Sequence, residues 1–371
     1  MLFKSAPRFW EKVSFSQSPI QALLGRTISV LLLPLSWIYG LIVWLKQSMI
    51  DSGIATLFKI HQPVPVPIIF VGNIRVGGTG KTPLVIALAN ELVQLGFKPG
   101  VISRGYQPNG GGKLSAPTAV GFDSDPISVG DESVLMARRI HHGIPIWVYP
   151  KRKACIDALL QSHPEVNVII SDDGLQHAGL VRWSAREGGR DLELVVQDER
   201  GIGNGRLLPA GPLRESANRE RDATITITDQ PTSNQILSNP KQFQLKPAIH
   251  NAYPLNRPHE AISFTQMLTK LVGLKIGALA AIGNPEKFFK ALTQLGVHLE
   301  QSLGLADHAP IHQSDLEKLK TDVILITEKD AVKCLGIEDD RIWVVPMALH
   351  LPVEFTQWVQ EVITRPNPYV K

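Results

Sequence analysis

The stretch FVGNIRVGGTGKTPLVIALANEL, residues 70–92, decides the fold because it joins an apolar segment to an amphipathic one through a glycine-rich turn. The run 66–73 predicts a buried strand, since its prolines lie only at its start, where a missing N–H group is tolerated. Leucines recur at helical spacing over 82–95, with Pro83 near the start and Gly96 after the end. We therefore expect a strand, a glycine loop and a helix in succession.

This loop has the composition of a nucleotide-phosphate site. Glycines let successive backbone N–H groups point into one concavity, and a helix N-terminus adds a partial positive charge. In such loops the lysine neutralises the β- and γ-phosphates and the hydroxyl residue after it ligates Mg²⁺. The general pattern has glycine where this chain has Arg75, and a plain glycine turn is the alternative, but the flanking strand and helix favour a nucleotide site. The expected nucleotide-binding residues are Gly77, Gly78, Thr79, Gly80, Lys81 and Thr82.

Apolar runs alternate with amphipathic segments after residue 60, which predicts an α/β fold with a P-loop NTPase-type parallel sheet and helices on both of its faces. A polar, proline-bearing stretch at about 230–256 reads as a connection or a short strand pair, and the alternation then resumes in a second, smaller α/β unit. The expected strands are 66–73, 100–103, 144–149, 166–171, 192–198, 223–229, 275–283, 322–330 and 342–346. The predicted domains are a helical membrane-anchoring region at 1–55, a nucleotide-binding domain at 56–230, a connection at 231–270 and a C-terminal domain at 271–371.

The charge of the 371-residue chain is concentrated at its beginning. The net charge is +4, and residues 1–60 hold six basic and two acidic residues, which accounts for the whole excess. A general nucleic-acid binder would spread its positive charge over the folded body, so we expect no nucleic-acid partner. Cys155 and Cys334 match no disulfide or metal-ligand spacing and are predicted to be free thiols in a reducing compartment.

The segment 28–45 carries no charge over 18 residues, which reaches the lower limit for crossing a bilayer. Trp37, Tyr39 and Trp44 suit a membrane interface, and the flanking basic residues suit anionic headgroups. A cleaved signal peptide and a buried core helix are the alternatives. We expect a membrane anchor that either spans the bilayer or lies on its anionic surface.

Besides the glycine loop, an acidic site is expected after the strand in VNVIISDDGLQH, residues 166–177. Asp172 and Asp173 follow this strand directly, and ligands gather at the carboxyl ends of strands in open α/β sheets. A turn or cap role would explain one aspartate, but two adjacent acids favour Mg²⁺ binding. Which of the two touches the metal directly is left open.

Four further motifs carry candidate residues. SRGY at 103–106 follows a strand, and NGRLLPAGPLRE at 204–215 has too much glycine, proline and arginine for an ordinary core. GDE at 130–132 precedes a helix, where a cap is the default explanation, and ADHAPIH at 306–312 is weak evidence by itself. The candidate substrate-binding residues are Arg104, Tyr106, Arg206 and Arg214.

Taken in order, the motifs resemble those of the bacterial tetraacyldisaccharide 4′-kinase family: VGNIRVGGTGKTP, SRGY, GDE, DDGLQH, NGRLLPAGPLRE and ADH. The resemblance covers about residues 10–360, and the family shares Arg75 in its variant of the loop. It implies transfer of the γ-phosphate of ATP, with Mg²⁺, to the 4′-hydroxyl of a tetraacyldisaccharide 1-phosphate glycolipid in lipid A biosynthesis. It also implies residence at the cytoplasmic face of the bacterial inner membrane, with no obligate protein partner.

The resemblance further implies roles for individual residues. It places the family's catalytic Asp–His pair on Asp131 and His308, with Lys81 as the third catalytic residue. Thr82 and the Asp172–Asp173 pair then form the Mg²⁺ site. Because Asp131 and His308 come from different predicted domains, catalysis is expected to depend on the two domains meeting.

Two other functions use the same loop. A membrane-associated nucleotide-driven switch or assembly ATPase would need no acceptor hydroxyl, but no guanine-reading Asn-Lys-x-Asp stretch is present. A lipid-binding protein with a vestigial nucleotide site is disfavoured by the intact Gly-Lys-Thr and Asp-Asp motifs.

Overall fold

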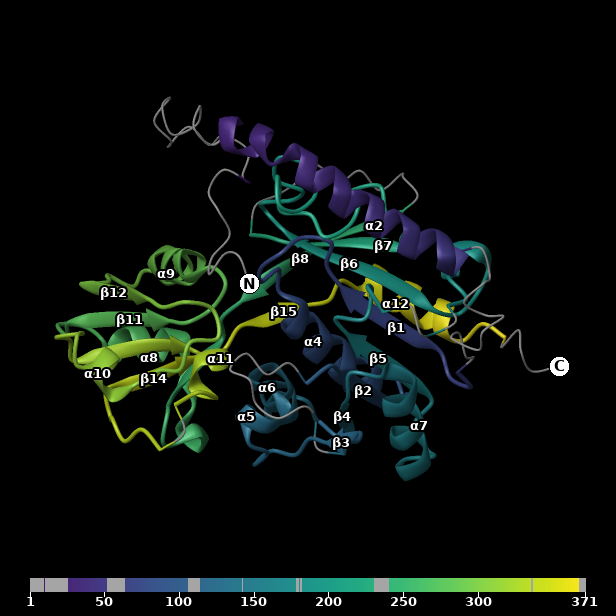
Figure 1. Ribbon diagram of the computed structural model, residues 1–371. Coiled ribbons are helices and arrows are strands. Elements are labelled where there is room, and N and C mark those ends of the chain that lie inside the picture. The colour runs from purple at the N-terminus through teal and green to yellow at the C-terminus, as the bar shows by residue number, and fades with distance from the viewer. Residues whose placement is uncertain are drawn as a thin grey trace.

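The computed structural model describes residues 10, 26–51, 64–105, 114–141, 143–177, 180, 182–229, 240–334 and 336–366. Over these residues the chain is an α/β protein with two sheets, a nine-stranded large sheet and a six-stranded small sheet. Figure 1 shows the two sheets side by side, each with its own helices. Tyr106 and parts of the predicted regions 1–55 and 231–270 lie outside the described residues.

The large sheet is mostly parallel and carries antiparallel strands at its two edges. Across it the order is β15 (Ala348–His350), β8 (Lys241–Ala248), β7 (Ala223–Ile227), β6 (Leu192–Asp198), β1 (Ile68–Gly72), β5 (Val168–Asp172), β2 (Pro99–Ser103), β4 (Ile146–Val148) and β3 (Thr118–Ala119). Only the β15–β8 and β3–β4 pairs are antiparallel. Parallel strands buried on both faces explain why the sequence shows continuous apolar runs.

Helices cover both faces of the large sheet. Within β1, alternate side chains enter opposite cores, because successive residues of a strand point to opposite faces. One core contains side chains of α4 (Lys81–Gln94), α6 (Asp131–Arg139) and α12 (Val353–Ile363), and the other contains α7 (Arg152–Ser162). The short helices α5 (Pro126–Val129) and η2 (Ala185–Glu187) lie in connections.

The small sheet has the order β10 (Ile262–Ser263), β9 (Asn251–Pro254), β14 (Ile342–Val345), β13 (Val323–Thr327), β11 (Ile276–Ala280) and β12 (Gln301–Gly304). It has two hydrophobic cores. One contains side chains of α8 (Phe264–Lys270) and α9 (Pro285–Gln294), and the other contains side chains of α10 (Gln313–Leu316) and α11 (Glu328–Ala331). The 3-10 helix η3 (Pro258–Glu260) joins β9 to β10.

Two features of the chain path differ from the simplest sequence interpretation. The polar stretch 241–248 is strand β8 of the large sheet, and the C-terminal β15 and α12 also return to that sheet. The run 322–330 was expected to be a single strand, but β13 ends at Thr327, whose side chain accepts a hydrogen bond from the Asp330 N–H and caps α11. The predicted domain limits stay predictions.

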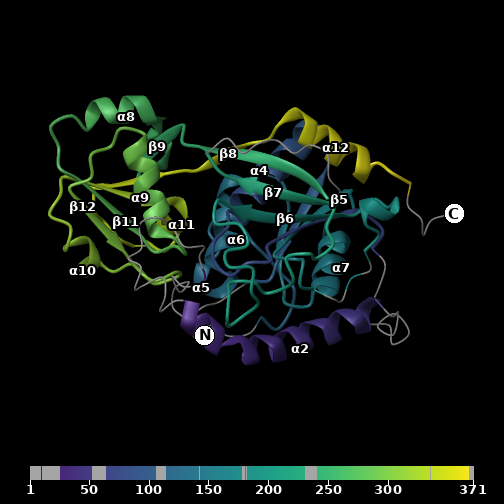
Figure 2. The same cartoon turned by 90° about the horizontal axis from the view of Figure 1, so that it is seen from above.

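The N-terminal helix α2 (Leu33–Asp51) lies along one side of the molecule (Figures 1 and 2). Its polar contacts are made with the loop 204–215: the Ser36 hydroxyl donates to the Leu207 carbonyl at 2.8 Å, and the Tyr39 hydroxyl donates to the Arg214 carbonyl at 2.9 Å. Among the residues described, no helix has the length and apolar character needed to cross a membrane.

Candidate active site

The glycine loop lies between β1 and α4, as the sequence predicts. Gly77 and Gly80 have φ angles of 103° and 89°, which side chains rarely allow. A Cβ at Gly80 would also lie 2.7 Å from the Ile227 side chain. Asn73 ties the loop together, because its amide donates to the Gly77 carbonyl at 3.2 Å and accepts from the Lys81 ammonium at 3.2 Å. Asn73 therefore connects the backbone of the loop to the Lys81 ammonium.

The two aspartates at the end of β5, Asp172 within the strand and Asp173 after it, lie beside this loop. Val71 of β1 pairs with Asp172, so the parallel register brings the end of β5 next to the start of the loop. The Lys81 ammonium lies 3.4 Å from a carboxylate oxygen of Asp173, and Arg214 lies 3.9 Å from the same oxygen. Burial opposes ionisation of Asp173, but Lys81 and Arg214 outweigh it, so the pKa of this carboxyl lies below its usual value.

Asp172 is more deeply buried than Asp173. The Ser103 hydroxyl donates to its Oδ2 at 3.1 Å, whereas its Oδ1 is buried without a hydrogen-bond partner among the described residues. Burial raises the pKa of Asp172 to about 7, and the negative charges of Glu132 and Asp173 add to the effect. A buried carboxylate oxygen with a free lone pair, beside a second carboxylate, fits a site for a divalent cation.

Arg182 holds the turn that follows these aspartates. Its guanidinium donates to the carbonyls of Gly174, Leu175 and His177 at 2.9, 3.0 and 2.7 Å, and it is paired with the buried Glu193. Three carbonyls bound by one planar group fix the backbone path from the end of β5 onward.

An aspartate and a histidine from different parts of the molecule meet near the loop. Asp131 begins α6 on the large-sheet side, His308 follows β12 on the small-sheet side, and the imidazole Nδ1 lies 3.0 Å from Asp131 Oδ2. Burial opposes ionisation of Asp131, but the hydrogen bond from His308 and the charge of Lys329 lower its pKa to about 2. Asp131 is therefore a carboxylate throughout the neutral range.

Lys329, on α11, lies beside the Asp131–His308 pair and forms a cluster with it, Glu132 and Asp307. Its ammonium group is 2.9 Å from Glu132 Oε1, 3.4 Å from His308 Nε2 and 3.6 Å from Asp307 Oδ1. Sequence reasoning missed Lys329, which comes two residues after the end of strand β13, within the run 322–330 that was expected to be strand.

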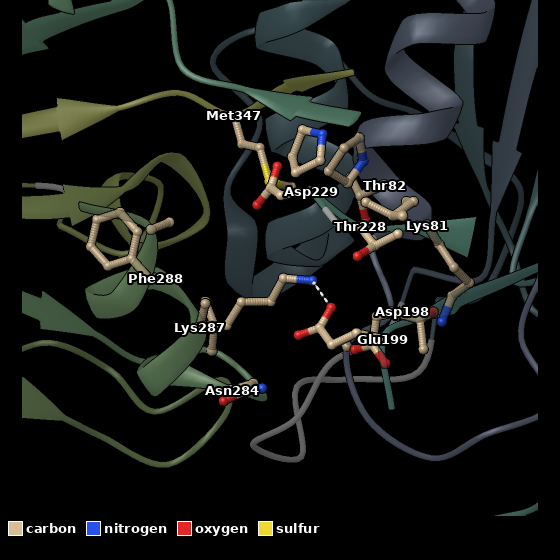
Figure 3. A pocket seen from close by; sticks show the side chains of 18 of the residues that line it. Lys81, Thr82, Asp198, Glu199, Thr228, Asp229, Asn284, Lys287, Phe288 and Met347 are labelled. Atoms are coloured by element: carbon tan, nitrogen blue, oxygen red, sulfur yellow. Dashed lines mark hydrogen bonds and ion pairs between the residues drawn. The ribbon is translucent and has the colours of Figure 1, made fainter. Parts of the chain in front are cut away.

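A cavity of about 1670 Å³ opens from the glycine loop between the two sheets. Figure 3 shows Lys81 and Thr82 on one side and the α9 residues Lys287 and Phe288 on the other, with the Lys287 ammonium reaching Glu199 at 2.9 Å. The small-sheet side touches the loop itself, since a Cβ at Gly283 would lie 3.0 Å from the Gly78 nitrogen. Other residues of the lining include Ile227, Thr228, Asp229, Phe243, Asn284 and Met347.

The four predicted substrate-binding residues have different surroundings. Arg214 lies beside Asp173, and Arg104 is exposed next to Ser103, which contacts Asp172. Arg206 is directed to the N-terminal segment instead, where its guanidinium donates to the Ser29 hydroxyl at 2.8 Å. Tyr106 lies outside the described residues.

Asn73, Arg152 and Arg200 also belong to this site and were missed. Arg152 donates to the Asp172 carbonyl at 2.6 Å, and Arg200 donates to the Gly78 carbonyl at 2.9 Å while paired with Asp198. Arg152 and Arg200 act through the backbone of a predicted residue, so no motif around them reveals their role, whereas Asn73 lies within the quoted loop motif and also contacts the Lys81 ammonium.

Comparison with known proteins places this chain in one family. The family model described as tetraacyldisaccharide-1-P 4′-kinase matches residues 28–364. The tetraacyldisaccharide 4′-kinase of Polynucleobacter asymbioticus is 50% identical over 376 residues, covering 99% of this chain and 98% of that protein, and its namesake in Herminiimonas arsenicoxydans is 43% identical, covering 89% and 90%.

A solved structure shares the fold. The crystal structure of the "apo" form of LpxK from Aquifex aeolicus in complex with ATP superposes with a TM-score of 0.67 at 24% identity, covering 91% of this chain and 99% of that one. With a family model that matches residues 28–364 and relatives that match over 98% and 90% of their own length, the chain belongs to the tetraacyldisaccharide 4′-kinase family.

Proposed function

We propose that this protein transfers the γ-phosphate of ATP to the 4′-hydroxyl of a tetraacyldisaccharide 1-phosphate in lipid A biosynthesis. The observation that supports it most directly is the contact of Asp131 with His308 beside a glycine loop that carries Lys81. A phosphate-binding loop alone fits any nucleotide hydrolase, whereas a carboxylate oriented by a histidine provides an acceptor for the proton of an alcohol.

The loop residues would bind the triphosphate. Backbone N–H groups of Gly77–Gly80 and the N-terminus of α4 favour the negative charge of phosphate, and Lys81 adds a full positive charge. The cavity beside the loop has apolar and polar walls from both sheets, which suits the rest of a nucleotide.

Thr82, Asp172 and Asp173 would hold Mg²⁺. No group of three or more His, Cys, Asp or Glu side chains is arranged as a metal site in the part of the chain that the structure describes. Mg²⁺ commonly uses one or two carboxylates together with substrate phosphates, and Asp172 Oδ1 is a buried oxygen with a lone pair to offer. When bound, the ion would neutralise charge on the phosphate oxygens.

Asp131 would take the proton of the sugar hydroxyl that receives the phosphate. In the transfer, a bond forms between the sugar oxygen and the γ-phosphorus, the bond from that phosphorus to the β–γ bridging oxygen breaks, and the hydroxyl proton passes to a carboxylate oxygen of Asp131. A pKa of about 2 keeps Asp131 ionised and able to accept a hydrogen bond from the hydroxyl. Because the transition state of phosphoryl transfer is loose, proton removal demands little basicity, and positioning matters more.

The N-terminal helix would place this site at a membrane. Several apolar side chains of α2 are exposed on the side away from its polar contacts, namely Leu35, Trp37, Ile38, Leu41, Ile42 and Trp44. An apolar helix face with tryptophans fits a helix that lies in the interface of an anionic bilayer. We place it on the cytoplasmic face of the bacterial inner membrane, where ATP meets a substrate with four acyl chains.

Labelled ATP tests the proposal. Incubated with γ-labelled ATP and tetraacyldisaccharide 1-phosphate in detergent micelles, the protein is expected to move the label into the lipid. A Lys81→Ala variant should transfer none. Release of labelled inorganic phosphate with an unlabelled lipid would contradict the proposal and favour a nucleotide-driven switch.

A further inference from the structure

The position of Lys329 has a chemical consequence for His308. An ammonium group carries only hydrogen-bond donors, so an imidazole nitrogen that faces it at 3.4 Å must be the acceptor. In a neutral imidazole with Nε2 as acceptor, the proton is on Nδ1, and Nδ1 faces Asp131 Oδ2 at 3.0 Å. The two contacts therefore require the same tautomer.

We infer that Lys329 is a positioning residue for the Asp131–His308 pair: its ammonium group donates to His308 Nε2 and holds the ring in the neutral Nδ1–H tautomer that donates to Asp131. The functional part of this inference rests on the role proposed above for Asp131. The opposite tautomer would turn the Nδ1 lone pair toward the carboxylate and remove the hydrogen bond that orients it.

The surroundings of Lys329 keep its proton in place. Burial disfavours its charge, but Glu132, Asp307 and Asp131 outweigh burial, so the pKa of the ammonium lies above its usual value. Glu132 is the closest of these at 2.9 Å, and the pKa of Glu132 is in turn lowered chiefly by Lys329. Lys329 is therefore protonated, and a hydrogen-bond donor, at neutral pH, and its ion pair with Glu132 holds the ammonium beside the imidazole.

The arrangement also links the two sheets. Lys329 and His308 come from the small-sheet side, whereas Asp131 and Glu132 begin α6 on the large-sheet side. The ring faces both Asp131 Oδ2 and the Lys329 ammonium only when the two sides are in contact, and its Nε2 also lies 3.7 Å from Asp307 Oδ1 on its own side. A second ion pair, Arg139 with Glu328, joins α6 to α11 next to this cluster.

Nitrogen NMR of the full-length protein tests the inference. With ¹⁵N-labelled histidine, and with His308→Gln used to assign its signals, the wild type at pH 7.5 is expected to show a protonated Nδ1 and an acceptor-type Nε2. Lys329→Met should populate the Nε2–H tautomer and lower kcat by about 10-fold to 100-fold, part of the contribution that a positioned general base makes. The KM for ATP should change by less than about threefold, because Lys81 and the loop are intact, and Lys329→Arg should retain the tautomer.

Lys333→Met is the matched control for structural damage. Lys333 is a buried lysine in the adjacent turn that bonds to Asp330 and to the Ala281 carbonyl, so its loss should lower the melting temperature without changing the tautomer. An Nε2–H or doubly protonated His308 in the wild type would overturn the inference, as would an unchanged tautomer in Lys329→Met. The wild-type spectrum decides even if that variant does not fold. A wild type that labels no lipid would refute the proposed function and leave the tautomer measurement valid.

Discussion

At the scale of single residues, the environment gives two nearby aspartates opposite properties. Burial raises the pKa of Asp172 to about 7, whereas the bond from His308 and the charge of Lys329 overcome burial and lower the pKa of Asp131 to about 2. Titratable groups whose environments separate their pKa values commonly have different tasks at one site. Asp131 suits an acceptor of a hydroxyl proton, and Asp172 suits a ligand whose charge a cation would stabilise.

The two cysteines give a prediction at the same scale. Cys155 and Cys334 are both buried free thiols, and burial raises the pKa of each to about 12. Because the thiolate is the reactive form and appears only as the pH approaches that value, we expect no reaction with a disulfide reagent between pH 7 and 9 in the folded protein. Absorbance should show labelling of both thiols in guanidinium chloride. Rapid labelling of either thiol under native conditions would contradict the described burial.

At the scale of elements, the turn after β5 depends on an arginine that is outside every motif. Arg182 and Arg186 both pair with Glu193, but only Arg182 also binds the carbonyls of the turn at 174–177. Arg182→Lys should therefore lower kcat/KM by about 10-fold to 100-fold and raise the Mg²⁺ concentration needed for half-maximal activity, as loss of groups that orient metal ligands commonly does. A Mg²⁺ titration of lipid phosphorylation measures both effects.

Arg186→Lys is the control for the arginine prediction. It weakens the same ion pair with Glu193 and leaves the carbonyl bonds of the turn in place, so its activity and Mg²⁺ requirement should stay within about threefold of the wild type. Equal losses in the two variants would mean that Arg182 supports the fold and does not position the aspartates.

Helix α2 gives the second prediction at this scale. Trp37 and Trp44 are 69% and 62% exposed, and burying a large apolar side chain contributes about 1.5–3 kcal/mol. Replacing both by Asp should weaken binding to anionic lipid vesicles by about 100-fold or more without changing ATP affinity. Val272→Asp, at an apolar residue of the small-sheet side that is 79% exposed, should leave vesicle binding unchanged. Co-sedimentation gives the measurement, and equal binding by all variants would exclude α2 as the membrane contact.

The sequence predicts those parts of the site that depend on local pattern. The loop 77–82 was predicted because a strand, a turn and a helix follow one another within a short stretch, and Asp172 and Asp173 were predicted because two adjacent acids come at the carboxyl end of an apolar strand. Strand β8 was less apparent, because its side chains are mostly exposed or half-buried and the strand lacks the apolar run of a buried one. Arg182 and Lys329 were missed because they act on partners that are distant in the sequence or on backbone atoms, and neither kind of contact leaves a local pattern.

At the scale of the whole molecule, the two sheets meet around the site. The large-sheet side supplies the phosphate loop, the aspartates after β5 and Asp131, and the small-sheet side supplies His308, Lys329 and one wall of the cavity. The chain passes between the sheets after β8 and again before β15, so two connections join them. In the proposed mechanism, the groups that bind the nucleotide and those that activate the sugar hydroxyl are brought together only when the two sides are in contact.

His308→Ala tests this central claim most directly, because it removes the proposed catalytic contribution of His308 on the small-sheet side and leaves the glycine loop whole. Single-turnover transfer of labelled phosphate to the acylated disaccharide should slow by about 10²-fold to 10⁴-fold, the range for a positioned acid–base group. The dissociation constant for ATP, measured by calorimetry on the same preparation, should change by less than about threefold. Transfer at the wild-type rate, or an ATP affinity that falls as far as the rate does, would contradict the account.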